Sequence, residues 1–474
     1  MQDFVVETQQ DEGFLIFKQR KRAPSGDGLF DPITAIHKYP DAHLEKHPIS
    51  LNPNSLNLNS ANPSTQYDPN ELGGGESLNP TATGFASEQK TISYEPIVPS
   101  QLLRADLRVS ENSRKVIDWA RRACSDVIAG KDGRLIVIIG PCSIHDPAQA
   151  LEYARLLAPL IPTLPDLIII MRAYFEKPRT SVGWKGLIND PDIDGSFKIN
   201  KGIKIARKLL CDLTHLGLPV AVEILDPISP QYLSELVSWG AIGARTTESQ
   251  IHREAASGAP HPVGFKNGTN GDVEVAIEAM KASSFPHSFI GTNDHGLVSI
   301  VKTSGNSALS LILRGGKKGA NFHREAVSEA RDALQKHRLS FAPSLIIDCS
   351  HGNSQKDYRN QAKVVKDICQ QIRAGEKSIH GVMIESNIGA GRQDVPAEGR
   401  EGLKHGISIT DGCIDFESTV QVLKDLQNAA ADRRSMGRRQ SLFDEVYLRR
   451  TSLSHDLQQF AINTAAIQQN PSNQ

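Results

Sequence analysis

The stretch "IVIIGPCSIHDP" (residues 136–147) runs a row of β-branched residues into a Gly-Pro corner, and the segment "AQALEYARLLAPL" follows it. A short apolar run that ends in turn residues predicts a buried strand, and apolar residues at three- and four-residue spacing predict a helix. The stretch therefore begins a strand–helix unit. Its corner holds Cys142, whose thiol could serve as a nucleophile, a redox centre, a metal ligand or a small buried side chain.

Strand-like runs of this kind recur along the chain, and helix-periodic segments fill most of the gaps between them. They are IVIIGPC (136–142), IIIMRAY (168–174), VAVEI (220–224), IGART (242–246), VGFKNG (263–268), LILRGG (311–316), LIIDCSHGN (345–353) and VMIESN (382–387). Eight such units predict an α/β fold of the (β/α)8 TIM-barrel type. The runs "HSFIGT" and "LVSIVKT", within residues 287–303, predict a β-hairpin inserted between the fifth and sixth units.

The chain divides into three regions by composition. We expect residues 1–93 to be a largely disordered N-terminal extension, residues 94–432 to form the barrel and residues 433–474 to be a charged C-terminal tail. Residues 40–92 are rich in Asn, Ser, Pro and Gly and contain too few apolar residues to offset the entropy of ordering. The segment "FVVETQQDEGFLIFKQRKR" ahead of them could form a short ordered piece.

Charge and cysteine usage limit the classes of partner. Lys and Arg number 53 against 54 Asp and Glu, so no net charge favours a nucleic acid or a membrane surface. No apolar run reaches the roughly 18 residues of a membrane span. The six cysteines are scattered without a C-x-x-C pair, which fits a reducing compartment. We therefore expect a cytoplasmic protein without disulfides, a homodimer or homotetramer whose other partners are small molecules.

An ionisable or metal-competent residue marks the C-terminal end of each predicted strand. These residues are Cys142, Arg172, Glu223, Arg245, Lys266, Arg314, His351 and Glu385. In a barrel these ends form one rim, where the active site lies. Any one of them could simply be the first solvated residue after a strand, but eight at eight strand ends indicate an active site.

The basic residues of this rim and of the loop that begins at residue 171 form one class. They are Arg172, Lys177, Arg179, Arg245, Lys266 and Arg314, and Thr180 adds a hydroxyl to the same loop. Cations gathered around one cavity repel each other unless anionic ligands offset their charge. Guanidinium groups bind phosphate and carboxylate in a bidentate manner, and Lys supplies a point charge. The inference is one or two substrates that carry phosphate and carboxylate groups.

A second class joins a thiol, an imidazole and two carboxylates: Cys142, His351, Glu385 and Asp411. Such a mixed set suits one divalent transition metal such as Mn, Fe, Zn or Co. Spacing gives no support, because the four residues lie on different units and only the barrel brings them together. Taken singly, the Cys could be a core residue, the Asp a helix N-cap and the His a hydrogen-bonded structural residue.

Eight motifs identify a family. They are "GPCSIHDP", "RAYFEKPRTSVGWKGLINDP", "WGAIGARTTESQIHRE", "PVGFKNGT", "ILRGG", "IDCSHGNS", "GVMIESN" and "SITDGC". In order, over about residues 94–432, they resemble the type I 3-deoxy-D-arabino-heptulosonate 7-phosphate (DAHP) synthases, most closely the fungal members. The resemblance implies the first step of the shikimate pathway, towards chorismate and the aromatic amino acids: phosphoenolpyruvate, D-erythrose 4-phosphate and water give DAHP and phosphate.

The resemblance also implies residue roles, and every matching position holds the family's residue. The implied metal ligands are Cys142, His351, Glu385 and Asp411. The implied phosphoenolpyruvate site is Arg172, Lys177, Arg245, Lys266 and Arg314. The implied contact with the phosphate of erythrose 4-phosphate is Arg179 and Thr180.

Feedback inhibition by an aromatic amino acid, bound near the inserted hairpin, is a further implication of the resemblance. The implied effector residues are Asp226, Pro230, Gln231, Pro260, Phe289, Gly291 and Val301. Gly291 is typical of tyrosine-sensitive members. Pro260 replaces a residue that is usually Ser, which removes a hydroxyl and a backbone donor. We therefore expect tyrosine regulation, with weakened or lost feedback as the alternative.

Two other functions compete with this interpretation. The same barrel is used by enzymes that join phosphoenolpyruvate to arabinose 5-phosphate, although the segments "FEKPRTSVGWKGLINDP" and "ARTTESQ" resemble the erythrose 4-phosphate family. A catalytically silent paralogue that senses aromatic amino acids within a hetero-oligomer is the second. That function predicts broken ligands or lost cations, and none is broken.

Overall fold

The computed structural model describes residues 4–11, 14–21, 35–40, 90–177, 183–337, 339 and 342–437. The chain forms two compact units, Met1–Ile92 and Ser93–Gln474, and each is described by itself.

The first unit contains a three-stranded antiparallel sheet in the order β1 (Phe4–Asp11), β2 (Phe14–Lys21) and β3 (Ala35–Pro40). Its first two strands coincide with the segment that the sequence marks as a potential ordered piece. Most of the tract for which we expect disorder, residues 41–89, lies outside the described residues, as do residues 438–474 of the tail.

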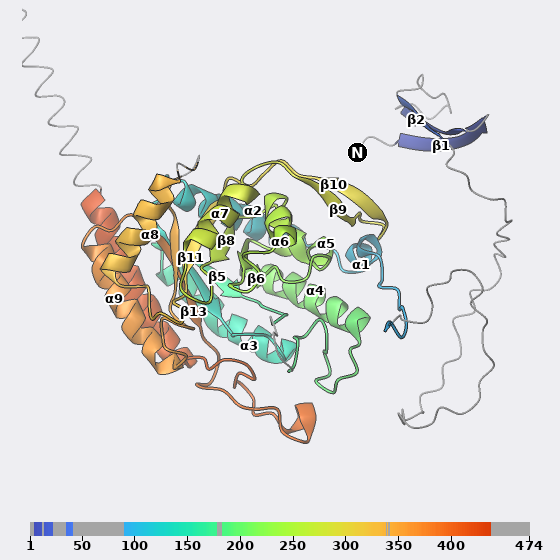
Figure 1. The fold of residues 1–474 in the computed structure, drawn as a ribbon. Coiled ribbons are helices and arrows are strands. Elements are labelled where there is room, and N and C mark those ends of the chain that lie inside the picture. Colours follow the sequence, from blue (N-terminus) through green and yellow to red (C-terminus); the bar gives the residue numbers. More distant parts are fainter. Residues whose placement is uncertain are drawn as a thin grey trace, which may run out of the picture. The chain divides into compact units, whose positions relative to one another are not determined.

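The second unit is built on a closed barrel of eight parallel strands, which confirms the predicted (β/α)8 fold (Figure 1). In order around the barrel they are β4 (Leu135–Gly140), β5 (Leu167–Arg172), β6 (Val220–Glu223), β7 (Trp239–Ile242), β8 (Val263–Lys266), β11 (Leu309–Leu313), β12 (Leu345–Asp348) and β13 (Ile379–Glu385). Residues of β4 alternate between two cores: Val137 packs toward the helices and Ile138 into the barrel. Burial on both faces explains why these strands read as unbroken apolar runs.

Helices surround the barrel (Figure 1). Between and after the strands the chain forms α3 (Pro147–Leu157), α4 (Ile199–His215), α5 (Pro230–Leu233), α6 (Gln250–Ser257), α7 (Glu274–Ser283), α8 (Arg324–Lys336), α9 (Gln361–Arg373) and a helix over residues 416–437, with short 3-10 turns η1 (Ala158–Thr163), η2 (Ser234–Leu236), η3 (Tyr358–Asn360) and η4 (Gly399–Gly402). Two helices precede the barrel, α1 (Ser100–Asp106) and α2 (Glu111–Ile128). Cys124 and Val127 of α2 share a buried cluster with Ile138, so this helix packs onto the barrel interior.

The fourth strand lies three residues earlier than its predicted position, at Trp239–Ile242 instead of 242–246. Directly after it the chain turns, because the carbonyl oxygen of Gly243 accepts hydrogen bonds from the backbone N–H groups of Thr246 and Thr247. In the sequence, Trp239 and Gly240 end the segment "SPQYLSELVSWG" (229–240), whose apolar residues recur at helical spacing. Arg245 therefore stands in this turn, three residues beyond the strand.

The segment between α7 and β11 contains two antiparallel strands, β9 (Ser288–Thr292) and β10 (Val298–Lys302). Ile290 pairs with Ile300, and both side chains face solvent, with exposed fractions of 82% and 76%. The opposite face of this pair, with Phe289 and Val301, lines a cavity.

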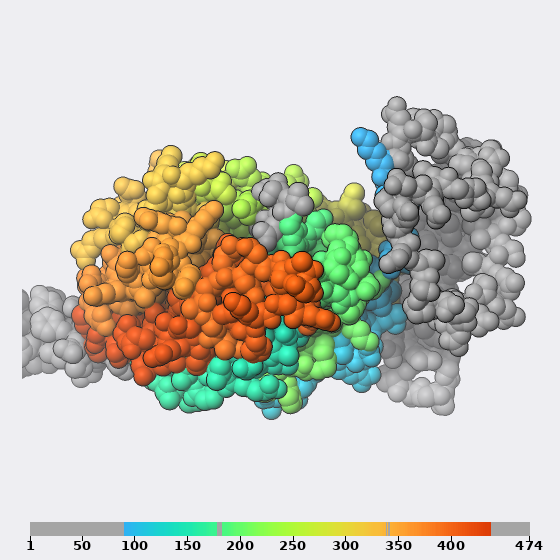
Figure 2. Space-filling model, turned by 90° about the horizontal axis from the view of Figure 1, so that it is seen from below, coloured from blue at the N-terminus to red at the C-terminus, as the bar shows by residue number. Residues whose placement is uncertain are grey.

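A long connection leads from β13 to the C-terminal helix and crosses one face of the barrel beside α3. Figure 2 shows it as the orange and red band above the teal residues of α3. His405 contacts Glu152 at 2.8 Å, and the backbone N–H of Gly406 donates to the side chain of Gln149. These contacts fix the segment that carries Asp411. No described helix combines the length and apolar character that a membrane crossing requires.

Candidate active site and effector cavity

Seven of the predicted site residues stand at or just after strand ends on one side of the barrel, because the parallel strands all end there. Arg172, Lys266 and Glu385 are the last residues of β5, β8 and β13. Cys142, Arg245, Arg314 and His351 follow their strands by one to three residues. The rim that the sequence predicts is therefore present.

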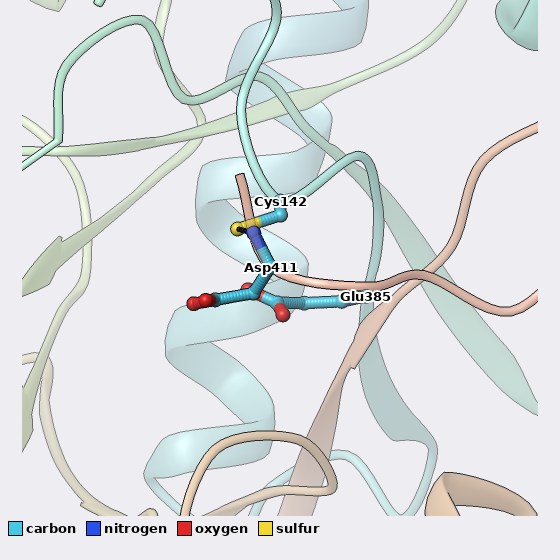
Figure 3. A group of neighbouring side chains, drawn as sticks. All are labelled: Cys142, Glu385 and Asp411. Atoms are coloured by element: carbon cyan, nitrogen blue, oxygen red, sulfur yellow. Dashed lines mark hydrogen bonds between the residues drawn. The ribbon is translucent and has the colours of Figure 1, made fainter. Parts of the chain in front are cut away.

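A candidate metal centre lies at this rim. Ligand atoms of Cys142, Glu385 and Asp411 all lie within 4.8 Å of one another, and Figure 3 shows the three side chains together. The thiol and the Glu385 carboxylate are buried, whereas Asp411 is exposed. The backbone N–H of Asp411 lies 3.4 Å from Sγ of Cys142, which ties the long connection to the corner after β4.

His351 lies beside this group. Its Nε2 is 3.9 Å from Oε1 of Glu385. Its Nδ1 points the other way, 2.9 Å from Oδ2 of Asp348 and 2.6 Å from Oγ of Ser350. The backbone of His351 has φ 53°, in the left-handed region. Such a conformation costs about 1–3 kcal/mol and concentrates at functional sites, so the surrounding contacts hold the imidazole in this orientation.

The donor set fits a divalent transition metal. Thiolate, imidazole and carboxylate oxygens are its usual protein ligands. Burial, and next the charge of Glu385, raise the pKa of Cys142 to about 11, so without a metal the group is a thiol. A catalytic nucleophile would need a base. His145 is a poor one, because burial lowers its pKa to about 4 and its Nδ1 lacks a hydrogen-bond partner among the described residues.

Three of the predicted cations contact either a candidate metal ligand or Asp348, the partner of His351. Nη2 of Arg172 lies 3.0 Å from Oε1 of Glu385, and Nζ of Lys177 lies 3.0 Å from Sγ of Cys142. Nζ of Lys266 lies 3.0 Å from Oδ2 of Asp348. Burial opposes the charge of Lys177, but its interactions with Cys142, Glu385 and Asp411 raise its pKa.

Two further cations complete the rim. Arg314 is partly buried, and burial, together with repulsion from Arg245, lowers its pKa. Asn267 fixes this strand end, since its Oδ1 accepts from the backbone N–H of Arg314 at 2.8 Å. The structure therefore brings Arg172, Lys177, Arg245, Lys266 and Arg314 to one end of the barrel. Arg179 and Thr180 lie outside the described residues.

Asp348 is a site residue that the sequence analysis missed. Its carboxylate is fully buried and contacts both Lys266 and His351. Asp348 is the last residue of the apolar run LIID and stands three residues before His351, which marks a strand end but not a buried partner.

A cavity of about 1000 Å³ lies between the β9–β10 pair and the helices α5 and α6. Six of the predicted effector residues line it: Pro230, Gln231, Pro260, Phe289, Gly291 and Val301. Asp226 does not line it, and its Oδ1 accepts from the backbone N–H groups of Ile228 and Ser229. Glu176 does line it, and burial, then the charge of Asp226, raise its pKa to about 8.

Known proteins share this architecture and sequence. Residues 106–424 match the DAHP synthetase I family. The tyrosine-inhibited phospho-2-dehydro-3-deoxyheptonate aldolase of Schizosaccharomyces pombe is 52% identical over 73% of this chain and 94% of its own. The phenylalanine-inhibited phospho-2-dehydro-3-deoxyheptonate aldolase of Saccharomyces cerevisiae is 53% identical over 72% of this chain and 93% of its own.

Among solved structures, the phospho-2-dehydro-3-deoxyheptonate aldolase of Francisella tularensis SCHU S4 is similar, with a TM-score of 0.70 and 49% identity. The match covers 72% of this chain and 98% of the chain of that structure. The family matches most of this chain, and the relatives are about 50% identical to it. The chain therefore belongs to the DAHP synthetase I family.

Proposed function

We propose that this chain is a 3-deoxy-7-phosphoheptulonate synthase, which condenses phosphoenolpyruvate with D-erythrose 4-phosphate and water to DAHP and phosphate, the first step of the shikimate pathway. The observation that carries the proposal is the contact between two site components: Lys177 and Arg172, of the cation class, lie 3.0 Å from Cys142 and Glu385, of the metal class. An anionic substrate bound by these cations would react beside the metal.

The cations bind the substrates. We assign phosphoenolpyruvate to Arg172, Lys177, Arg245, Lys266 and Arg314, and the phosphate of erythrose 4-phosphate to Arg179 and Thr180. Phosphate and carboxylate groups match the guanidinium forks, and burial of Arg172 and Lys266 excludes water that would weaken the attraction. The same charges offset the repulsion between two phosphorylated substrates and hold them in register.

One divalent metal, Mn, Fe, Zn or Co, is assigned to Cys142, His351, Glu385 and Asp411. Bound there, it would act as a Lewis acid on the aldehyde of erythrose 4-phosphate. C3 of phosphoenolpyruvate attacks that aldehyde carbon, and water adds to the positive C2. The resulting hemiketal phosphate then expels phosphate by C–O cleavage, while Lys266, Arg245 and Arg314 hold the anionic groups.

Tyrosine is the effector that we assign to the cavity beside β9 and β10. A Cβ atom at Gly291 would lie 2.8 Å from Cγ2 of Val301, so a serine at this position would push against Val301 in the wall of the cavity. The curated relatives named tyrosine-inhibited and phenylalanine-inhibited support an aromatic amino acid as the class of effector.

Self-association is assigned to the outer face of the β9–β10 pair. Ile290, Val298 and Ile300 are 76–82% exposed on this face. A contiguous exposed apolar face favours association, and a second copy would bury it in a homodimer or homotetramer. All six cysteines carry free thiols, which supports a cytoplasmic location.

A substrate-swap assay tests the reaction. With added Mn²⁺, the purified chain should consume phosphoenolpyruvate with erythrose 4-phosphate and not with arabinose 5-phosphate. A preference for arabinose 5-phosphate would replace the proposal with the sibling reaction. Activity that appears only when a relative is added would favour the silent sensing subunit.

A further inference from the structure

Asp348 has four hydrogen-bonding contacts although it is fully buried. Its Oδ1 accepts from the backbone N–H and the hydroxyl of Ser350, both at 3.0 Å. Its Oδ2 accepts from Nζ of Lys266 at 3.0 Å and lies 2.9 Å from Nδ1 of His351. One oxygen atom thus contacts a residue of the cation class and a residue of the metal class.

The contacts around Nδ1 determine the imidazole tautomer of His351. Oγ of Ser350 lies 2.6 Å from Nδ1, and this hydroxyl donates its hydrogen to Oδ1 of Asp348. Both atoms next to Nδ1 are therefore acceptors, so Nδ1 carries the hydrogen. The lone pair is left on Nε2, the atom that lies 3.9 Å from Oε1 of Glu385. Partners of this kind orient metal-binding imidazoles and raise their basicity.

The contact with Lys266 has a different effect. The Lys266 side chain is almost fully buried, and a buried ammonium group needs a partner of opposite charge. Asp348 provides it from β12, while Lys266 stands on β8 and Arg314 follows β11 between them. The carboxylate therefore fixes the Lys266 amino group at the rim, at the end of the strand next to the one that Arg314 follows.

We propose that Asp348 is a positioning residue that orients His351 toward the metal and Lys266 toward phosphoenolpyruvate through the same carboxylate oxygen. The inference rests on the proposed roles of those two residues. It adds that the metal site and the substrate site share one buried anion, so that a single change at Asp348 weakens both.

The test uses Asp348→Asn in the full-length protein, which keeps the shape and removes the charge. We expect the Kd for Mn²⁺, measured by equilibrium dialysis without substrates, to rise roughly 10- to 100-fold. At saturating Mn²⁺ we expect the KM for phosphoenolpyruvate to rise more than the KM for erythrose 4-phosphate. Replacement of the metal by Co²⁺ gives an absorption spectrum, which should shift in the variant because the imidazole is reoriented.

Ser350→Ala is the matched control, because it removes a contact to His351 and Asp348 but leaves the pair with Lys266. It should weaken Mn²⁺ binding less than Asp348→Asn and leave the KM for phosphoenolpyruvate unchanged. If Asp348→Asn does not fold, a double variant with Lys266→Met and Asp348→Asn replaces it, and Lys266→Met alone is its reference. Weaker Mn²⁺ binding in the double variant than in Lys266→Met supports the proposal, and equal binding contradicts it.

Wild-type Mn²⁺ affinity and an unchanged KM for phosphoenolpyruvate in Asp348→Asn would overturn the inference. Equal effects of Ser350→Ala and Asp348→Asn on both quantities would also overturn it, because a general structural role would then suffice. The dialysis result is independent of the reaction. A wild-type chain that binds Mn²⁺ but makes no DAHP would refute the proposed function. The Mn²⁺ affinities of the variants would still test whether Asp348 positions His351.

Discussion

Nζ of Lys177 lies 3.0 Å from Sγ of Cys142. A residue assigned to phosphoenolpyruvate thus contacts a residue assigned to the metal. Glu176, the residue before Lys177, lines the cavity beside β9 and β10. The segment that follows β5 therefore borders both the candidate active site and the candidate effector site.

Replacement of Lys177 by Met should damage substrate binding. A hydrogen bond to a charged group contributes about 1.5–3 kcal/mol, so we expect the KM for phosphoenolpyruvate to rise roughly ten- to a hundredfold. Initial rates at varied phosphoenolpyruvate measure this. Lys185→Met, which changes a lysine of the same connection that is outside the assigned site, is the control, and an equal effect of both variants would contradict the role of Lys177.

Removal of the metal should abolish activity reversibly. Dialysis against a chelator should stop DAHP formation, and added Mn²⁺ should restore it because three of the four assigned ligands lie at or just after the ends of barrel strands. Cys142→Ala and His351→Ala should not be restored at the same Mn²⁺ concentration. A Cys142→Ala protein that is active without a metal would refute the ligand assignment.

Metal affinity should increase with pH. The pKa of Cys142 is raised to about 11, so the thiol is protonated below that pH and must lose its proton when a metal binds. Each unit of pH rise therefore strengthens binding about tenfold while the thiol remains protonated. Competition with a chelator at several pH values from about 6.5 to 8.5 measures the Kd. If log Kd changes with pH no more steeply in the wild type than in Cys142→Ala, the result would contradict this prediction.

Gly291→Ser should weaken inhibition by tyrosine. The added side chain begins 2.8 Å from Cγ2 of Val301, and overpacking costs about 1–3 kcal/mol, so the inhibition constant should rise roughly five- to a hundredfold. The uninhibited kcat should stay unchanged. Ser299→Ala, at the cross-strand partner that does not line the cavity, is the matched control. Unchanged tyrosine inhibition in Gly291→Ser would remove this residue from the effector site.

Ile300→Lys should weaken self-association. The charge would stand on the exposed apolar face opposite Ile290, where a buried unpaired ammonium group is unfavourable. Sedimentation should show a smaller species than the wild type at equal concentration. Lys302→Ala, on the same strand, provides the comparison. Wild-type assembly of Ile300→Lys would place the interface elsewhere.

The sequence predicted the barrel well because its strands are buried on both faces. Ile136 and Val137 point into different cores, yet both are apolar, so the run is unmistakable. β7 was misplaced because Trp239 and Gly240 follow a segment with helical spacing. The turn after Ile242 depends on hydrogen bonds to one carbonyl oxygen, that of Gly243, which no pattern of apolar residues reports.

The candidate site could be predicted as a set of residue types, but its internal contacts could not. Strand ends predict which residues meet at the rim. The pairing of Lys266 with Asp348 joins residues 82 positions apart, and a carboxylate in "LIIDCSH" has no sequence feature that distinguishes a buried partner from a solvated strand end. The contact of Lys177 with Cys142 likewise depends on where the loop after β5 folds.

The initial rate of DAHP formation by the purified chain alone tests the central claim most directly. With phosphoenolpyruvate, erythrose 4-phosphate and Mn²⁺, we predict equal amounts of DAHP and phosphate, and an ¹⁸O label in the bridging oxygen of phosphoenolpyruvate recovered in the phosphate. Omission of either substrate or of the metal should stop the reaction. Absence of DAHP from a folded, Mn²⁺-loaded protein would contradict the account.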